Sequence, residues 1–367
     1  MNKIKSFWGS VGLMAASTIG AGMFSLPYVF SKSGWVLGIF YIFILGCAIV
    51  FAHYLYWLTL ERVGERQRLL GLVRARLGTA AFYVALVSVI VGLLLTLAVY
   101  LILAQDFGKM ILPAPFANYG AALFWITVSL PLFLKISRFV GAEFAATAFK
   151  IAVVLFVFFI SKGGSFSAPS FNMGNIFLPF GAILFSLAGW TAIEPIFEWH
   201  KKNKDANALP ELALGTLISA AVYLVFIAAI LGSGGAVSSD IFSGLSSWTA
   251  WELNIFIILG ILAVWTPYLS ISLEVKNELE KDLRMPALLS LGAVFLLPPV
   301  VFVSGIFNFI GAISIAGGVF SALQYIFIIL VSKKILVLSG LKKFFADLLI
   351  LVFLAAAVYE IYYFTVG

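Results

Sequence analysis

The stretch STIGAGMFSLPYVF, residues 17–30, belongs to an apolar run long enough to cross a bilayer. The small residues Gly20, Ala21 and Gly22 adjoin one another in it, and a proline follows. Glycine and proline interrupt helices, and non-helical backbone is tolerated at membrane depth only where it is buried in protein or lines a cavity. The stretch therefore predicts a broken membrane helix whose freed N–H and C=O groups meet a polar ligand.

Apolar residues dominate the whole chain: they make up 63% of it, while charged residues make up 11%. Apolar runs of about 20 residues recur along the sequence, and each is long enough to cross the hydrocarbon core of a bilayer. A soluble core does not need so much apolar length, and the runs lack the alternation typical of a β-barrel. We therefore expect an all-α polytopic membrane protein.

These runs predict eleven transmembrane helices. They cover residues 8–30, 34–60, 79–107, 117–135, 139–161, 175–199, 211–232, 251–275, 287–304, 307–331 and 344–365. The N-terminal residues MNKIKSFW are too few, and too directly joined to the first run, to form a cleaved signal peptide. The single cysteine, Cys47, cannot form an intramolecular disulfide, so it does not indicate the compartment.

Basic residues are concentrated in every second loop between the predicted spans. They gather before span 1 and after spans 2, 4, 6, 8 and 10: Lys3, Lys5, Arg62, Arg66, Arg68, Arg74, Arg76, Lys135, Arg138, Lys201, Lys202, Lys204, Lys276, Lys281, Arg284, Lys333, Lys334, Lys342 and Lys343. The other loops carry only Lys32, Lys109 and Lys162. The positive-inside rule then places the N-terminus in the cytoplasm and the C-terminus outside a cell (inner) membrane. Membrane topology thus explains the net charge of +7, and we expect no nucleic-acid partner.

The sixth predicted span has a break of the same kind in LPFGAILFSLAGWTAIEPIFEW, residues 178–199. When Pro27 is superimposed on Pro195, the small residues Gly20, Ala21 and Gly22 fall on Ala188, Gly189 and Trp190. Span 1 runs outward and span 6 inward, so broken helices 1 and 6 predict an inverted 5+5 repeat. The expected units are a core of residues 1–343, with repeats at about 8–161 and 175–331, and an additional helix 11 within 344–367.

Each break offers what an amino acid zwitterion needs. N–H groups at the start of the outer half of span 1 carry a partial positive charge that suits a carboxylate, and carbonyls that end the preceding half-helices suit an ammonium. Small residues are required because a bulky side chain would hold the ligand away from the backbone. The alternative is that glycine and alanine serve only close helix packing, as they often do in membranes. The matched second break favours the binding interpretation.

Two stretches resemble the amino acid/auxin permease family. IGAGMFSLPYVFSKSGWVLG (19–38) is similar to the family's first-span signature, and EPIFEWHKKNKDANALPEL (194–212) is similar to the stretch after its sixth span. This family belongs to the amino acid–polyamine–organocation superfamily, which has the leucine-transporter fold. The resemblance implies a permease that imports an amino acid together with protons or sodium ions.

Carried over to this chain, the family pattern assigns roles to the residues around both breaks. The carboxylate-binding loop would be formed by Thr18, Ile19, Gly20, Ala21 and Gly22. The amine and the side chain of the substrate would face Ser186, Leu187, Ala188 and Gly189. Phe185 would be the aromatic lid that closes over bound substrate, and ordinary packing is the alternative for it. Small residues and Phe185 at the breaks favour a neutral amino acid.

Lys150 is an ionisable residue in the middle of span 5, and a charge at that depth is a functional candidate by default. The chain resembles proton-coupled relatives in the superfamily that have a lysine in span 5, in the place between spans 1, 5 and 8 where sodium-coupled relatives hold an ion. This resemblance implies that the neighbours of Lys150 are the carbonyls near Ala16 and Ile19 and the hydroxyls of Thr266 and Ser270. A buried lysine loses its proton more readily, so Lys150 predicts proton coupling. The alternative is that its long stem snorkels to water.

Other residues bear on the coupling ion. Sodium-coupled members of the family look to have an asparagine four residues before the first glycine of the GxG motif. This chain has Ala16 at that position, which is a departure from the sodium-coupled pattern. H⁺ is therefore expected as the coupling ion rather than Na⁺. Glu194, just past the second break, is a second candidate for proton coupling. We expect His53 to be a hydrogen-bonded core residue and His200 to be solvated near the cytoplasmic face.

The leading hypothesis is a proton-coupled symporter that imports a neutral amino acid by alternating access. The alternatives are a Na⁺-coupled or exchange-type transporter of the same fold, and a membrane amino acid sensor that binds without transport. No paired carboxylates at catalytic spacing and no HExxH, Walker or GxSxG motif occur, so we expect no enzyme, metal site or cofactor. The expected partners are the amino acid and the lipid bilayer, with the protein acting as a monomer.

Overall fold

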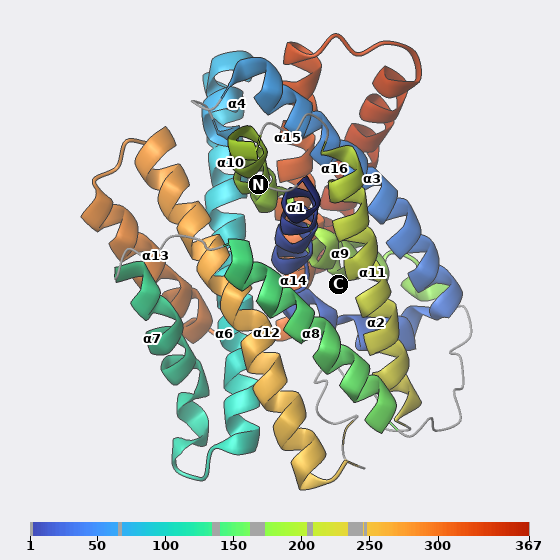
Figure 1. Cartoon of the computed structure of the whole chain (residues 1–367), viewed down its shortest axis with the longest axis vertical. Coiled ribbons are helices and arrows are strands. Elements are labelled where there is room, and N and C mark those ends of the chain that lie inside the picture. Colours follow the sequence, from blue (N-terminus) through green and yellow to red (C-terminus); the bar gives the residue numbers. More distant parts are fainter. Residues whose placement is uncertain are drawn as a thin grey trace.

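The structure, a computed structural model, describes residues 3–64, 68–133, 140–161, 173–203, 208–233, 245 and 248–366. Every regular element in these ranges is a helix (Figure 1). The predicted all-α class is therefore confirmed for the part of the chain that the structure describes.

The helices of the first predicted repeat are α1 (Lys3–Thr18), η1 (Ala21–Phe24), α2 (Leu26–Ser33), α3 (Trp35–Val63), α4 (Leu69–Leu77), α5 (Thr79–Leu86), η2 (Val87–Val91), α6 (Gly92–Ile111), η3 (Phe116–Tyr119), α7 (Gly120–Phe133) and α8 (Val140–Ile160). The rest of the chain forms η4 (Met173–Asn175), α9 (Leu178–Leu187), η5 (Trp190–Ala192), α10 (Ile193–Asn203), α11 (Leu209–Gly232), α12 (Ala250–Asn277), η7 (Glu278–Asp282), α13 (Ala287–Val303), α14 (Phe309–Ser314), η8 (Ile315–Ser321), α15 (Ala322–Ile335) and α16 (Gly340–Val366). Three of these elements, η2, η7 and η8, are π-helical turns, which occur frequently at functional sites.

Many of these helices have the length and composition of membrane spans. Among the described residues, 8 are long and apolar enough to cross a bilayer: Trp35–Val63, Thr79–Ile111, Phe116–Phe133, Leu178–Lys201, Leu209–Gly232, Ala250–Asp282, Phe309–Ile335 and Gly340–Thr365. Two shorter apolar helices, Ala145–Ile160 and Ala287–Val303, lie in predicted spans 5 and 9. The count of eleven spans stays a prediction.

Local sequence signals explain several helix ends. Gly34 ends α2 with a φ of 91°, a conformation that L side chains rarely adopt, and the chain turns there into α3. Thr249 caps α12, because its backbone N–H and its hydroxyl both donate to the Glu252 carboxylate at 2.7 Å. The single residue Gly34 thus connects two consecutive helices, while the Thr249 cap fixes where α12 begins.

The two interrupted helices lie at the centre of the bundle. α1 packs against α8 and α11, and α9 packs against η8 and α3 (Figure 1). In the Leu178–Lys201 helix, 83% of an apolar 18-residue stretch is buried within the protein, whereas in Gly340–Thr365 the corresponding share is 22%, so that helix lies at the periphery. Backbone that leaves the helical pattern in α1 and α9 is therefore surrounded by protein rather than by lipid, as membrane depth requires.

The π-helical turn η8 reaches the second interrupted helix because glycines face each other there. A Cβ atom on Gly317 would collide with the carbonyl oxygen of Gly181 and would lie 2.8 Å from the Cβ of Phe185. Any larger residue would push η8 away from α9. This contact brings the end of η8 next to the break that follows Leu187.

Candidate functional site

The first helix is broken between Thr18 and Ala21, as the sequence predicted. α1 ends at Thr18, Gly20 is extended with φ −144° and ψ −151°, and the short turn η1 begins at Ala21. An extended residue inside a helical run releases the carbonyls of the preceding turn from the helical hydrogen-bond pattern. Carbonyls at the end of α1 are thus available to partners outside their own helix.

The second break lies between Leu187 and Trp190. α9 ends at Leu187, Ala188 has φ −67° and ψ 105°, and Gly189 has φ −127° and ψ 19°. The chain resumes as η5 and continues into α10. Both predicted interruptions therefore exist as departures of the backbone from helical geometry, on two helices that are far apart in the sequence.

Tyr223 of α11 bridges the two breaks. Its hydroxyl lies 2.7 Å from the carbonyl oxygen of Thr18 and 2.6 Å from that of Ser186, and donates its hydrogen toward both. The side chain is fully buried. A buried carbonyl without a donor is costly, so Tyr223 stabilises the ends of both half-helices at once. Sequence reasoning missed it, because a tyrosine within an apolar run gives no signal of direction.

The glycines at the breaks are needed for close approach. A Cβ on Gly22 would lie 2.8 Å from the Cα of Ser186, and one on Gly20 would lie 2.6 Å from the hydroxyl oxygen of Tyr100. A Cβ on Gly189 would lie 2.7 Å from the hydroxyl oxygen of Thr18. The first break therefore touches the second one directly, and no side chain separates the two backbones.

A small polar cavity of about 40 Å³ lies between the breaks. Its lining includes the predicted residues Thr18, Gly20, Gly22, Phe185 and Ala188. The other lining residues were not predicted and come mainly from α6, η5, α12 and the η8–α15 helix: Ser17, Leu93, Thr96, Tyr100, Trp190, Thr191, Ile271, Ser321 and Gln324. A cavity of this size has room for only a few water molecules, so lining side chains must move to admit an amino acid.

The remaining residues predicted at the breaks lie behind this lining. They are Ile19, Ala21, Ser186, Leu187 and Gly189, all of them buried. Their carbonyls and small side chains shape the breaks, as the contacts of Gly189 and Ser186 show.

Lys150 of α8 lies against the first break. Its ammonium donates to the carbonyl of Ile19 at 2.7 Å and to that of Ala16 at 3.2 Å, and the residue is 2% exposed. The snorkelling alternative is therefore wrong for this structure, since the ammonium points into the protein. Thr266 and Ser270 lie on α12, which packs against both α1 and α8, and the Thr266 hydroxyl is buried with no hydrogen-bond partner among the described residues.

Glu194 lies in the first turn of α10 and outside the lining of the cavity. Its carboxylate forms an ion pair with Arg68, the residue before α4, and accepts a hydrogen bond from the Tyr56 hydroxyl at 2.7 Å. Burial by itself would lower the pKa of Arg68, but the carboxylates of Glu274 and Glu194 outweigh it and hold that pKa above its ordinary value. The sequence predicted Glu194 as a candidate but did not indicate these partners.

A family model for transmembrane amino acid transporter proteins matches residues 3–273 of the chain. The chain belongs to the transmembrane amino acid transporter family. The match covers the first break, Lys150, the second break and most of α12, and it confirms the resemblance that the two quoted stretches indicated. No curated protein matches this family member.

Solved structures show the fold of the transporter. MhsT in complex with L-phenylalanine matches with a TM-score of 0.66 at 15% identity, over 96% of this chain and 97% of that one. A manganese transporter from Eremococcus coleocola matches with a TM-score of 0.62 at 15% identity, over 99% of this chain and 88% of that one. At these identities the likeness establishes the fold, which is the leucine-transporter fold.

The structure agrees with the prediction for one of the transporter's two histidines and contradicts the prediction for the other. The prediction for His53 is confirmed, because this fully buried residue shares a hydrogen bond of 2.9 Å with the hydroxyl of Tyr325. The prediction of a solvated His200 is wrong. His200 is 1% exposed, is paired with Glu211 and lies 3.1 Å from the Ser10 hydroxyl. The beginning of α11 folds over the end of α10 and excludes water from this pair, which a linear sequence does not reveal.

Proposed function

We propose that the protein imports a neutral amino acid by proton-coupled alternating access. The observation that carries this proposal is the contact of two broken helices around a small polar cavity, with Tyr223 bonded to both. Main-chain groups freed at such breaks replace the water that surrounds a zwitterion in solution. The carboxylate would bind at residues 18–22 and the ammonium at the carbonyls around residues 186–189.

The cavity lining supports a neutral substrate. None of the described residues that line it carries a charge, so a cationic or acidic side chain would have no counter-ion there. Among the lining residues that the structure describes there is also no carboxylate, histidine or cysteine, which disfavours a manganese ion as cargo despite the similar fold of the Eremococcus coleocola transporter. Amino acid binding, as in the MhsT complex with L-phenylalanine, agrees better with these groups. Phe185, at the edge of the cavity, is the proposed lid.

Lys150 supports a proton as the coupling ion. Its ammonium occupies the space between α1 and α8 and bonds to two carbonyls that a sodium ion would otherwise need. When the lysine loses its proton, the attraction to these carbonyls weakens, and α1 is freed to move. Ala16, Thr266 and Ser270 surround this proposed ion site, and Glu194 is the second proposed proton carrier. Sodium coupling remains the alternative that a sodium gradient tests.

The membrane arrangement is part of the proposal. Eleven spans with an inverted 5+5 repeat in residues 1–343 would place the N-terminus in the cytoplasm and the C-terminus outside the cell (inner) membrane. The interruptions at α1 and α9 support the repeat, and the alternation of lysine and arginine supports the orientation. In this arrangement α16 is the additional helix, and one monomer contains the whole site.

Uptake by purified protein in proteoliposomes tests the function. A panel of labelled amino acids is offered with a pH gradient or a sodium gradient imposed separately. Accumulation of a neutral amino acid under the pH gradient alone supports the proposal. Accumulation under sodium alone supports the sodium-coupled alternative, and saturable binding without uptake supports a sensor.

A further inference from the structure

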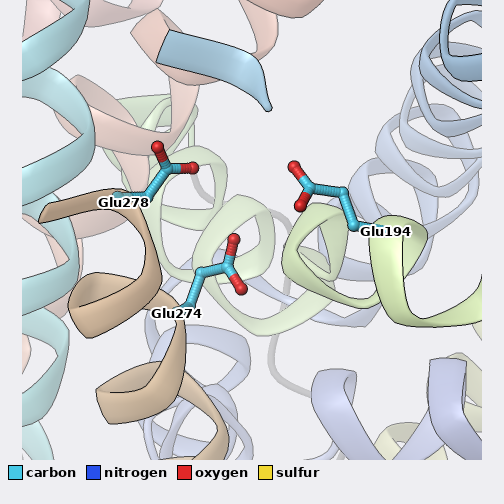
Figure 2. Close-up of side chains that lie close together, drawn as sticks. All are labelled: Glu194, Glu274 and Glu278. Carbon is cyan, nitrogen blue, oxygen red and sulfur yellow. The ribbon is translucent and has the colours of Figure 1, made fainter. Parts of the chain in front are cut away.

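A group of buried charged residues lies apart from the cavity, where α4, α10 and α12 meet. Glu194 belongs to α10, Glu274 to α12 and Glu278 to the π-helical turn η7 that extends α12. Figure 2 shows Glu274 and Glu278 projecting from one helix toward the helix that carries Glu194. One carboxylate oxygen from each of the three residues lies within 4.8 Å of the other two. With Arg68 they form what we call the charge cluster.

Arg68 binds two of the three carboxylates. It forms an ion pair with Glu194, and its Nη2 lies 3.3 Å from Oε2 of Glu274. Glu278 is different: the residue is fully buried, no N–H or O–H donor among the described residues bonds to its oxygens, and the Asp282 carboxylate lies close enough to share a proton with it. Within the described part of the chain, the titratable and charged groups that face Glu278 are Arg68, Tyr56, Glu194, Glu274 and Asp282.

The charges of the cluster do not balance. Among the residues that the structure describes, three buried carboxylates face the one guanidinium of Arg68, and Asp282, which accepts a hydrogen bond from the Gly71 N–H at 3.1 Å, adds a further acidic group. Like charges at this separation repel strongly away from water, and a buried charge without a partner is costly. The cluster therefore needs an additional positive charge in order to stay closed.

A proton meets this need better than a metal ion. Arg68 already bonds to Glu194 and Glu274, so a divalent ion bound by all three carboxylates would lie against the guanidinium and be repelled by it. A proton on Glu278 removes one negative charge, takes up no space, and turns an acceptor into a donor that can bond to a neighbouring carboxylate.

We propose that the charge cluster binds a proton on Glu278 and holds α10, α12 and the start of α4 together only while that proton is bound. This inference rests on the proposed transport function for its orientation, which places the cluster at the cytoplasmic face. When the proton leaves, repulsion separates α10 from α12 and opens the path from the cavity to the cytoplasm. An acidic cytoplasm would then keep the inner side closed and slow import, independently of Lys150.

Labelling of a buried cysteine tests the proposal. In a Cys47→Ala background, Ser10→Cys places a thiol in the fully buried part of α1 beside His200. Inside-out vesicles are treated with a membrane-impermeant maleimide at several pH values, and each rate is divided by that of the denatured protein to remove the titration of the thiol. Release of one proton should raise the corrected rate by up to about tenfold per pH unit as the solution becomes more alkaline.

Variants of Glu278 decide the outcome. Glu278→Gln keeps the shape and stays neutral, so its labelling should be slow at every pH. Glu280→Gln is the matched control on the same turn, where Glu280 pairs with Lys276 at 3.3 Å, and it should retain the pH dependence of the background. A pH dependence that survives Glu278→Gln overturns the proposal. Closure that requires magnesium or calcium and is abolished by a chelator also overturns it, in favour of a metal site.

A second measurement covers the case in which Ser10→Cys perturbs folding. The melting temperature in detergent, with Ser10 intact, should fall as the pH rises, and Glu278→Gln should remove that dependence. If the melting temperature depends on pH equally in both proteins, the proton site is refuted. Substrate binding is measured on the same samples. If no amino acid binds while the pH dependence follows Glu278, then the transport function fails and the proton site stands.

Discussion

Replacement of Lys150 by methionine gives the sharpest test of how transport is driven. Methionine keeps the approximate length of the stem but removes the ammonium that bonds to the carbonyls of Ile19 at 2.7 Å and Ala16 at 3.2 Å. Hydrogen bonds to a charged group contribute about 1.5–3 kcal/mol each, so the variant loses about 3–6 kcal/mol of attraction. It also no longer buries a charge, which had cost several kcal/mol.

These two effects have opposite sign and partly offset each other, so we expect Lys150→Met to fold with a lowered melting temperature and to bind substrate. The loss should appear in coupling. A single buried lysine carries one proton, and one proton per substrate lets a pH gradient of about one unit sustain about tenfold accumulation. In Lys150→Met the same gradient should give no accumulation, and labelled substrate should only equilibrate across the membrane.

The assay is uptake into proteoliposomes under an imposed pH gradient, followed until the internal concentration is constant. Lys109→Met is the matched control, because Lys109 is an exposed lysine that pairs with Asp106 at 3.3 Å and lies far from the breaks in sequence. The control should accumulate substrate as the unaltered protein does. If Lys150→Met also reaches about tenfold accumulation, Lys150 does not carry the coupled proton.

Three further predictions concern the breaks. Gly20→Ala should weaken substrate binding, measured by isothermal titration calorimetry, because its Cβ would lie 2.6 Å from the Tyr100 hydroxyl oxygen. Adding Tyr100→Phe should restore part of the affinity. Unchanged affinity in Gly20→Ala would contradict the steric argument. Tyr223→Phe removes the one hydroxyl hydrogen that two buried carbonyls share, at a cost of about 1–3 kcal/mol, so it should lower both the melting temperature and the affinity. A full-length protein with normal values for both would refute the bridging role. Phe185→Ala should increase the rate of substrate release in stopped-flow measurements with little change in the association rate, whereas an unaltered release rate would argue against a lid.

Several parts of the site could be predicted because their signals are local. Gly20, Gly22 and Gly189 interrupt long apolar runs, and such residues stand out wherever a continuous helix would be the simplest structure. Lys150 stands out because it is a lone charge within an apolar run, and charges at that depth need a buried partner. The structure supplies the partner in the carbonyls of the first break.

Other parts could not be predicted. Tyr223 and Gln324 lie in helices that are apolar on nearly all sides, and such helices show no amphipathic pattern from which the inward face could be derived. In a soluble helix that pattern would identify the buried positions. Lipid is as apolar as the protein interior, so a membrane helix needs no polar outer face and its sequence does not say which way a side chain points.

The sequence by itself therefore determined the all-α class, the membrane setting, the two broken helices and the lysine beside them, since each depends on neighbouring residues along one segment. Only the tertiary structure decided which segments meet. Arg68, Glu194 and Glu278 are widely separated in the chain, and their buried contact depends on how α4, α10 and η7 pack. That packing follows from the shape of many side chains together, which no single stretch of the sequence contains.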